Sequence, residues 1–135
     1  MHDKPDALKF DLHHGTWRPF RGDLPGQGRR LDIRRGHVPF GAGFTRIDRG
    51  CQIKIQPASD QVLYVISGEI AVVQADTTAL VAHSGDVLML RAGARLALDI
   101  VGHCHFFYVL APDVDWRESL SPTGALNPIN GDKSW

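Results

Sequence analysis

Turn signals divide this chain into short strands, and no other feature of the sequence limits its fold so strongly. From residue 30 to residue 112, apolar-rich runs are separated by glycine, proline, aspartate or serine about every eight to twelve residues. Several runs alternate apolar and polar residues, which is the period of a half-buried strand. Since no long helical period interrupts them, a parallel βαβ sheet is not expected. The pattern predicts an all-β protein, a sandwich or barrel of roughly eight or nine short antiparallel strands.

The 135 residues suit one domain with one core. We expect an irregular N-terminal arm over residues 1–29 that could include one short strand, a β-barrel over 30–112 and a short C-terminal tail over 113–135. Within the barrel, 30–35 alternates as a strand does, and Gly68-Glu69 is expected to separate two strands. The beginning of the tail could form one or two helical turns.

Charge and composition exclude some classes of function. The formal net charge is zero and the pI is near 7.1, so we expect no general attraction to nucleic acid or to a membrane. Most arginines lie in the first half of the chain, where a solvated or ion-paired face is the favoured interpretation and an anion or subunit contact is the alternative. No apolar run is long enough for a membrane helix or marks a signal peptide, and Cys51 and Cys104 lack metal-type spacing. These features predict a cytoplasmic protein with free thiols.

Two glycine-punctuated hairpins carry a family resemblance. Their spacing is similar to the two motifs of the cupins, small jelly-roll barrels: Gly68 matches the last glycine of the first motif, and Gly85 and Gly93 match the glycines of the second. Cupins hold their metal with histidines and a glutamate of these motifs. Here Gln61 stands at the glutamate position, and Leu96 at the histidine position of the second motif. The positions of the first motif's histidines fall within 54–57, which contains no histidine.

Among cupins, the chain resembles the EutQ-like ethanolamine-utilisation proteins. The strings "GAGFTRID", "DQVLYVISGEI", "SGDVLMLRAG", "FFYVLAP" and "VDW" carry this resemblance over about residues 38–116. It implies a jelly-roll barrel and a link to ethanolamine or acetyl-phosphate metabolism, with an acetate-kinase-type activity attributed to the group. Phosphoryl transfer requires Mg²⁺, carboxylates and cationic clamps, and the sequence has no nucleotide-binding motif.

Five residues form the predicted ligand-binding set. Side chains alternate along a strand, so Gln61 shares a face with Leu63 and Val65, and the cupin resemblance implies that this face looks into the barrel. A barrel mouth can hold a small molecule between apolar walls and a few polar groups. The predicted set, for a small polar or anionic metabolite bound without a metal cofactor, is Lys54, Gln56, Asp60, Gln61 and Tyr108. The alternative interpretation is that the first four are solvent-side residues of a hairpin.

A pair of histidines keeps a metal-dependent alternative open. His103 and His105 share one face of the last strand and could chelate a divalent transition metal if a third ligand joined them. Whether they reach the interior depends on which face looks inward. The interior face chosen here is the more apolar set, Cys104, Phe106, Tyr108 and Leu110. The histidines then point outward, toward solvent or a subunit interface.

Three functions therefore compete. The favoured one is a EutQ-like cupin that binds a small metabolite, as an accessory protein of a catabolic pathway. The second is a metal-dependent isomerase, lyase or dioxygenase using His103 and His105. The third is a structural homodimer, since barrels of this kind leave edge strands that a partner chain can cover. Arg46, Arg91 and Arg95 could form an anion site, although paired surface charges are the favoured interpretation.

Overall fold

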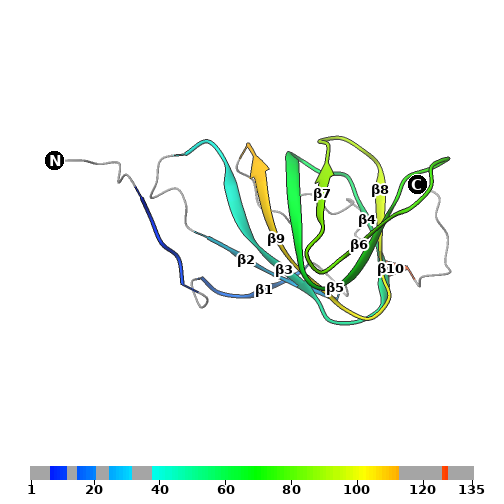
Figure 1. Cartoon of the computed structure of the whole chain (residues 1–135), viewed down its shortest axis with the longest axis horizontal. Helices are drawn as coiled ribbons and strands as arrows, with labels where there is room; N and C mark the ends of the chain where they lie inside the picture. The colour runs from blue at the N-terminus through cyan, green and yellow to red at the C-terminus, as the bar shows by residue number, and fades with distance from the viewer. Residues whose placement is uncertain (1–6, 12–14, 21–24, 32–37, 113–125, 128–135) are drawn as a thin grey trace.

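The protein is built from β-strands that curl around one core (Figure 1). The computed structural model describes residues 7–11, 15–20, 25–31, 38–112 and 126–127, and these contain strands but no helix. The strands are β1 (Arg18–Pro19), β2 (Gln27–Arg30), β3 (Gly41–Ile47), β4 (Cys51–Ile55), β5 (Asp60–Val73), β6 (Leu80–His83), β7 (Val87–Leu90), β8 (Leu96–Ile100), β9 (Cys104–Ala111) and β10 (Leu126–Asn127). The predicted all-β fold is confirmed, and a helix in that part of the chain would have contradicted it.

All strand pairs are antiparallel, and β5 is the centre of the sheet. Strands β6 and β7 follow one another along one side of β5, and β9 and β8 lie along the other. Strand β3 pairs with β9, and β4 pairs with β8. The sheet therefore bends across its middle into two halves that face each other, so that one face of each half can bury the core.

The predicted interior face of the last strand is confirmed. Along β9, Cys104, Phe106, Tyr108 and Leu110 are all buried, at 0–2% exposure, while the residues between them are half-buried. They meet the inward residues of β5, of which Leu63 and Val65 are fully buried. Each such side chain contributes about 1.5–3 kcal/mol when it is removed from water. The inward faces of β4 and β8 add Ile53, Ile55, Leu98 and Ile100.

Gly68 does not separate two strands, so that expectation is wrong. Strand β5 continues for 14 residues through this glycine. Gly68 has φ +83°, a left-handed conformation that glycine adopts without a steric penalty, and a Cβ at this position would collide with the carbonyl oxygen of His103. The register to β9 shifts between Val65 and Ser67. The glycine therefore bends a continuous strand, and this bend lets β5 contribute to both halves of the barrel.

The arm contributes to the barrel more than the sequence suggested. Strand β2 pairs with β3, and β1 pairs with β2, so both extend one half of the sheet. Phe20 is only 4% exposed and belongs to the core. The strand expected over 30–35 and the helical turns expected after 112 lie almost wholly outside the described residues. Of the tail, 126–127 pairs with β4.

Candidate functional site

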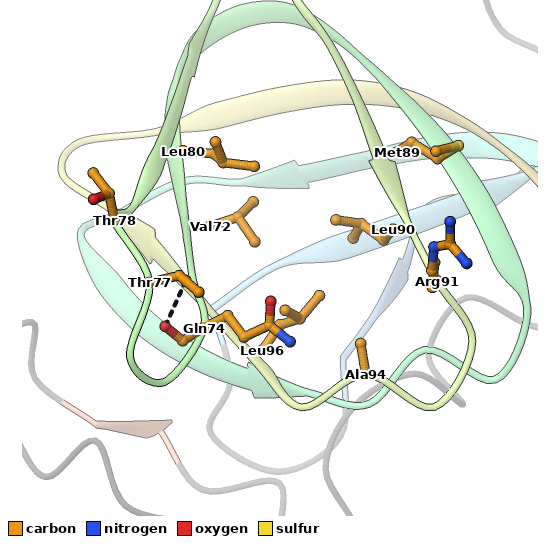
Figure 2. A pocket seen from close by; sticks show the side chains of 10 residues that line it. All are labelled: Val72, Gln74, Thr77, Thr78, Leu80, Met89, Leu90, Arg91, Ala94 and Leu96. Atoms are coloured by element: carbon orange, nitrogen blue, oxygen red, sulfur yellow. Dashed lines mark hydrogen bonds between the residues drawn. The ribbon is translucent and has the colours of Figure 1, made fainter.

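A pocket of about 230 Å³ opens at one end of the barrel (Figure 2). It lies between the hairpin that joins β5 to β6 and the turn that joins β7 to β8. Its walls are formed by Val72, Gln74, Thr77, Thr78, Leu80, Met89, Leu90, Arg91, Ala94 and Leu96. Sites for drug-sized molecules generally start at about 300 Å³, so this smaller volume suits a small metabolite.

The floor of the pocket is apolar and continuous with the core. Val72, Leu90 and Leu96 are each 4–5% exposed and belong to the core cluster. At the rim, Leu80 is 61% exposed, so apolar surface reaches the solvent there, whereas the Met89 side chain points away from the hollow (Figure 2). A ligand seated here would remove this surface from water, at about 25 cal/mol for each Å² of apolar area.

Polar groups of the pocket come partly from the β5–β6 hairpin. The backbone N–H and the hydroxyl of Thr77 both donate to the carbonyl oxygen of Gln74, at 3.2 and 2.8 Å, and Asp76 closes the turn with φ +62°. These bonds fix the hairpin without using the Gln74 amide or the Thr78 hydroxyl. Neither of these side chains has a hydrogen-bond partner among the described residues, and the Gln74 amide reaches over Leu96 into the hollow, whereas the Thr78 side chain points away from it (Figure 2).

Arg91 carries the only formal charge among the ten lining residues. It follows β7 directly, and within the described part of the chain its guanidinium makes no hydrogen bond or ion pair. A guanidinium offers a planar fork of donors that matches a carboxylate or phosphate. Since no carboxylate lines the pocket, the pocket favours an anion over a cation. The sequence pointed to Arg91 through its place beside a turn, but it could not show a pocket there.

The structure separates the predicted ligand-binding residues into two groups. Gln61 and Tyr108 face the interior, as expected, and each is 2% exposed. Gln61 lies opposite Leu90 of the pocket floor in the β5–β7 register, and Tyr108 lies opposite Leu63. Neither lines the pocket. They lie in the packed barrel beside it, so they can shape the floor but do not reach its surface.

Lys54, Gln56 and Asp60 do not converge on Gln61. Lys54 alternates with the buried Ile53 and Ile55, so its side chain lies on the outer face of β4. The Gln56 amide donates to the Gly93 carbonyl oxygen at 3.4 Å, and the Asp60 carboxylate accepts from the backbone N–H of Ala92 at 2.9 Å.

Gln56 and Asp60 therefore hold the turn between β7 and β8, which adjoins the pocket. The structure gives them a role in positioning the pocket wall rather than a shared place around a ligand.

The residues present do not fit a metal ion at the position that cupins use. Leucine has no donor atom, and an amide such as that of Gln61 is a poor ligand for transition metals. Leu96 instead forms apolar floor of the pocket. Among the residues that the structure describes, no three His, Cys, Asp or Glu side chains gather into a group that could hold a metal.

The two histidines lie apart from the pocket. His103 is exposed, whereas His105 is half-buried on the outer face of β9 within an arginine–aromatic cluster. We use this term for Trp17, Arg29, Phe44, Arg46 and His105. The His105 ring centroid is 6.0 Å from those of Trp17 and Phe44, and the guanidinium carbon of Arg46 is 4.0 Å from the Trp17 centroid. That of Arg29 is 4.8 Å from both Trp17 and Phe44.

The charges of this cluster also oppose a metal at His105. Burial, then the positive charges of Arg29 and Arg46, lower the pKa of His105, with a smaller contribution from His103 and only Asp48 acting in the opposite direction. The same two guanidiniums repel a divalent cation. The buried Nε2 of His105 has no hydrogen-bond partner in the described structure, but what surrounds it is aromatic and cationic.

The two cysteines are not candidate nucleophiles. Both are buried and free, and neither forms a disulfide. Burial raises the pKa of the Cys51 thiol to about 11 and that of Cys104 to about 12. A thiol is a nucleophile in its deprotonated form, so both groups are inert near neutral pH. Cys51 and Cys104 serve as small apolar residues of the core.

Comparisons with known proteins extend these observations. The family model "Ethanolamine utilisation protein EutQ" matches residues 38–118. No curated protein sequence matches the chain. In the described part of the chain, no helix is both long and apolar enough to cross a membrane.

Solved structures show the same fold at low sequence identity. The EutQ protein of Clostridium difficile is 21% identical with a TM-score of 0.59, over 67% of this chain and 64% of that one. The chain thus spans less than two thirds of that protein. Ectoine synthase from P. lautus is 18% identical with a TM-score of 0.65, over 85% and 83% of the two chains. The cupin domain of Cnp3 from Schizosaccharomyces pombe is 15% identical with a TM-score of 0.61, over 78% and 74%.

Proposed function

This chain belongs to the EutQ family of cupin proteins, and from this premise we propose that it binds a small anionic metabolite in its barrel pocket without a metal. The observation that carries the proposal is the composition of the pocket. Leu96 occupies the position of a cupin metal ligand and forms apolar floor, while Arg91 supplies a cation at the rim. Contacts with an organic ligand therefore replace coordination to a metal as the source of binding energy.

We further propose that the protein serves a catabolic pathway in which its family takes part, as the name of the ethanolamine utilisation family suggests. The pocket offers no pair of groups for nucleophilic or acid–base catalysis, because its lining contains no histidine, cysteine, aspartate or glutamate. Binding rather than turnover is the function that this set of side chains supports best.

A homodimer is a second proposal, favoured by an exposed apolar stripe. On the outer face of the sheet, Val62 lies opposite Met89 and Tyr64 opposite Val87, with exposures of 43–69%. In the described structure β7 pairs only with β5, which leaves its other edge open. Light scattering at several concentrations tests this proposal, and a monomer at high concentration would contradict it.

Thermal shift tests the binding proposal. Protein without a histidine tag is treated with EDTA, dialysed and heated with small carboxylates, phosphates, amines and nucleotides. Because a ligand that binds only the folded state raises the melting temperature, we expect small carboxylates to stabilise the protein and amines of similar size not to. Stabilisation only after a transition metal is restored would contradict the proposal, as would no stabilisation by any anion.

A further inference from the structure

Strand β7 has an open edge and an apolar outer face. Among the described strands it pairs only with β5. Its outward side chains, Val87 and Met89, are 61% and 69% exposed, while Leu88 and Leu90 point into the core. Proteins generally protect an exposed edge with charges or prolines, and β7 contains neither. An apolar edge without this protection is typical of a surface that another strand covers.

Backbone hydrogen bonds fix which groups of β7 are used by β5. The N–H of Gly85 donates to the carbonyl oxygen of Val65 at 2.8 Å, and the N–H of Val65 donates to the carbonyl oxygen of Asp86 at 3.0 Å. Val65 therefore turns both of its backbone groups toward this side of β5. In an antiparallel strand the same direction recurs at every second residue, so Leu63 bonds to its partner Leu88.

The backbone groups of Val87 and Met89 consequently point away from β5. They face the open edge, where no described strand pairs with β7. The same two residues carry the exposed apolar side chains. An added strand uses this combination, because its main chain bonds to the edge and its side chains pack beside those of the edge strand.

Strand β6 also has an open edge, but polar groups protect it. The Nε2 atom of His83 lies 2.8 Å from Oε1 of Glu69 on the neighbouring strand. The backbone N–H of His83 donates to the Asp86 carboxylate at 2.8 Å, and its carbonyl oxygen accepts from the Asp86 N–H at 2.9 Å. Since these groups are already used by the turn, β7 is the better surface for an added strand.

The sequence of β7 is self-complementary in the antiparallel direction. Opposite residues of an antiparallel pair lie on the same face, so an outward residue needs an outward partner. If Leu88 lies on a two-fold axis, Val87 lies opposite Met89 of the partner subunit, and the edge-facing backbone groups of both strands are paired. Asp86 precedes β7 and Arg91 follows it, so this direction also brings ends of opposite charge together.

We propose that two copies of this chain join along β7, antiparallel, with Val87 of one copy opposite Met89 of the partner subunit. One half of the sheet then continues from one copy into the other. This inference rests on the homodimer proposal and names the surface that forms the dimer. The contact is isologous, as a two-fold symmetric dimer requires. A strand of four residues makes a small interface, so the dimer is expected to dissociate on dilution.

Loss of one edge-facing N–H tests the pairing. Met89→Pro removes the N–H and the side chain, whereas the matched control Met89→Ala removes only the side chain. Because β5 does not use the Met89 N–H, both variants should keep the circular dichroism of the natural protein. By sedimentation equilibrium we expect the dimer dissociation constant of Met89→Pro to be at least about tenfold larger than that of Met89→Ala, since each copy loses a hydrogen bond.

Cysteine cross-linking tests the register. Val87→Cys and Met89→Cys are purified separately, mixed and oxidised. Opposite residues that exchange hydrogen bonds have Cα atoms about 5.5 Å apart, which a disulfide spans, whereas the diagonal distance between two copies of one residue is about 7–8 Å. We expect linked dimers from the mixture and at least about tenfold fewer from either variant alone. The natural protein, whose two cysteines are buried, is the control.

The possible results separate this inference from the proposal on which it rests. If the natural protein stays a monomer at high concentration, both fail, and the open edge is left to a different protein. If it forms a dimer but Met89→Pro and Met89→Ala dissociate alike, another surface forms the dimer and the pairing along β7 is wrong. Should Met89→Pro lose its fold, the cross-linking decides: no disulfide from the mixture, or an equal yield from either variant alone, overturns the inference.

Discussion

Two regions of the molecule hold arginines in opposite ways. In the arginine–aromatic cluster, Arg29 is 5% exposed and stacks on two rings, and Arg46 donates from Nε and Nη2 to the Gln27 side-chain oxygen while it covers Trp17. At the pocket, Arg91 is exposed and forms no such contact with any described residue. Both guanidiniums of the first pair stack on aromatic rings and Arg46 has donors engaged by Gln27, whereas Arg91 keeps its charge and its donors available.

This difference separates a structural use of arginine from a binding use. A guanidinium stacked on an aromatic ring is stabilised by a cation–π interaction, and its methylene groups cover apolar surface. These contacts attach the arm to the sheet. A guanidinium at the rim of an apolar pocket contributes little to stability, because an exposed charge is solvated in the folded and unfolded states alike. Its donors are available to a ligand.

The largest expected effect is on stability, from Trp17→Ala. Trp17 contacts both guanidiniums and the His105 ring, so its loss removes the packing that joins the arm to the sheet. We expect the free energy of unfolding to fall by about 2–3 kcal/mol, with ligand affinity unchanged. Urea denaturation followed by circular dichroism measures the change, and Trp17→Phe should lose less. A loss below about 0.5 kcal/mol would remove the structural role of the cluster.

The second-largest expected effect is a loss of ligand affinity in Arg91→Gln. This change removes a charge-assisted hydrogen bond, so we expect the affinity for a small carboxylate to fall by about tenfold or more. Stability should stay within about 0.5 kcal/mol, since the side chain is exposed and free of described contacts. Calorimetry and urea denaturation of the same preparation check both statements. Should stability fall as it does for Trp17→Ala, the two regions would not differ as described.

A smaller effect is expected from pH. The fold lowers the pKa of His105 below its ordinary value of 6.5, through burial and the charges of Arg29 and Arg46, and so favours the neutral ring. The unfolded chain therefore takes up this proton first as pH falls. The stability that His105 contributes is fully present above about pH 6.5 and is lost as pH falls through 6.5 toward its folded-state pKa.

Urea denaturation at pH 7.5 and 5.5 tests this coupling in the natural protein and in His105→Gln. We expect the natural protein to lose more stability than the variant on acidification. Equal losses in the two proteins would mean that the cluster does not disfavour the protonated ring.

The smallest expected effect is from Leu96→His. This change restores one imidazole at the cupin ligand position, but a bound transition metal needs three or more protein donors and Gln61 supplies only an amide. We expect the metal content of the tag-free variant to stay equal to that of the natural protein. Elemental analysis measures it. A stoichiometric metal in Leu96→His would show that the barrel keeps further donors for an ion.

The sequence predicts the strands better than it predicts the pocket. Alternation along β9 was enough to choose the buried face, because its consequence is local: Phe106 and Tyr108 point inward if Cys104 does. The expectation that Gly68 separates two strands is wrong because a glycine with positive φ can either end a strand or bend it. The pairing with β9 decides between these outcomes, and its partner residue lies some 36 residues further along the chain.

The pocket is formed by residues that are far apart in the sequence, so a local sequence pattern does not predict it. Gln74 and Thr78 belong to one hairpin and Arg91 to the end of another strand, and the curl of the whole sheet brings them to one cavity. The sequence grouped Arg91 with Arg46 as a possible anion site. The structure places Arg46 in the arginine–aromatic cluster, where it contacts Trp17 of the arm.

The most direct test is one calorimetric comparison of EDTA-treated natural protein, Arg91→Gln and Arg95→Gln with a small carboxylate such as pentanoate, repeated after a stoichiometric addition of Zn²⁺ or Ni²⁺. We expect saturable binding to the natural protein and to Arg95→Gln, an affinity lower by about tenfold or more for Arg91→Gln, and no gain in affinity from either metal. Binding that needs the metal, or that survives unchanged in Arg91→Gln, would contradict this expectation.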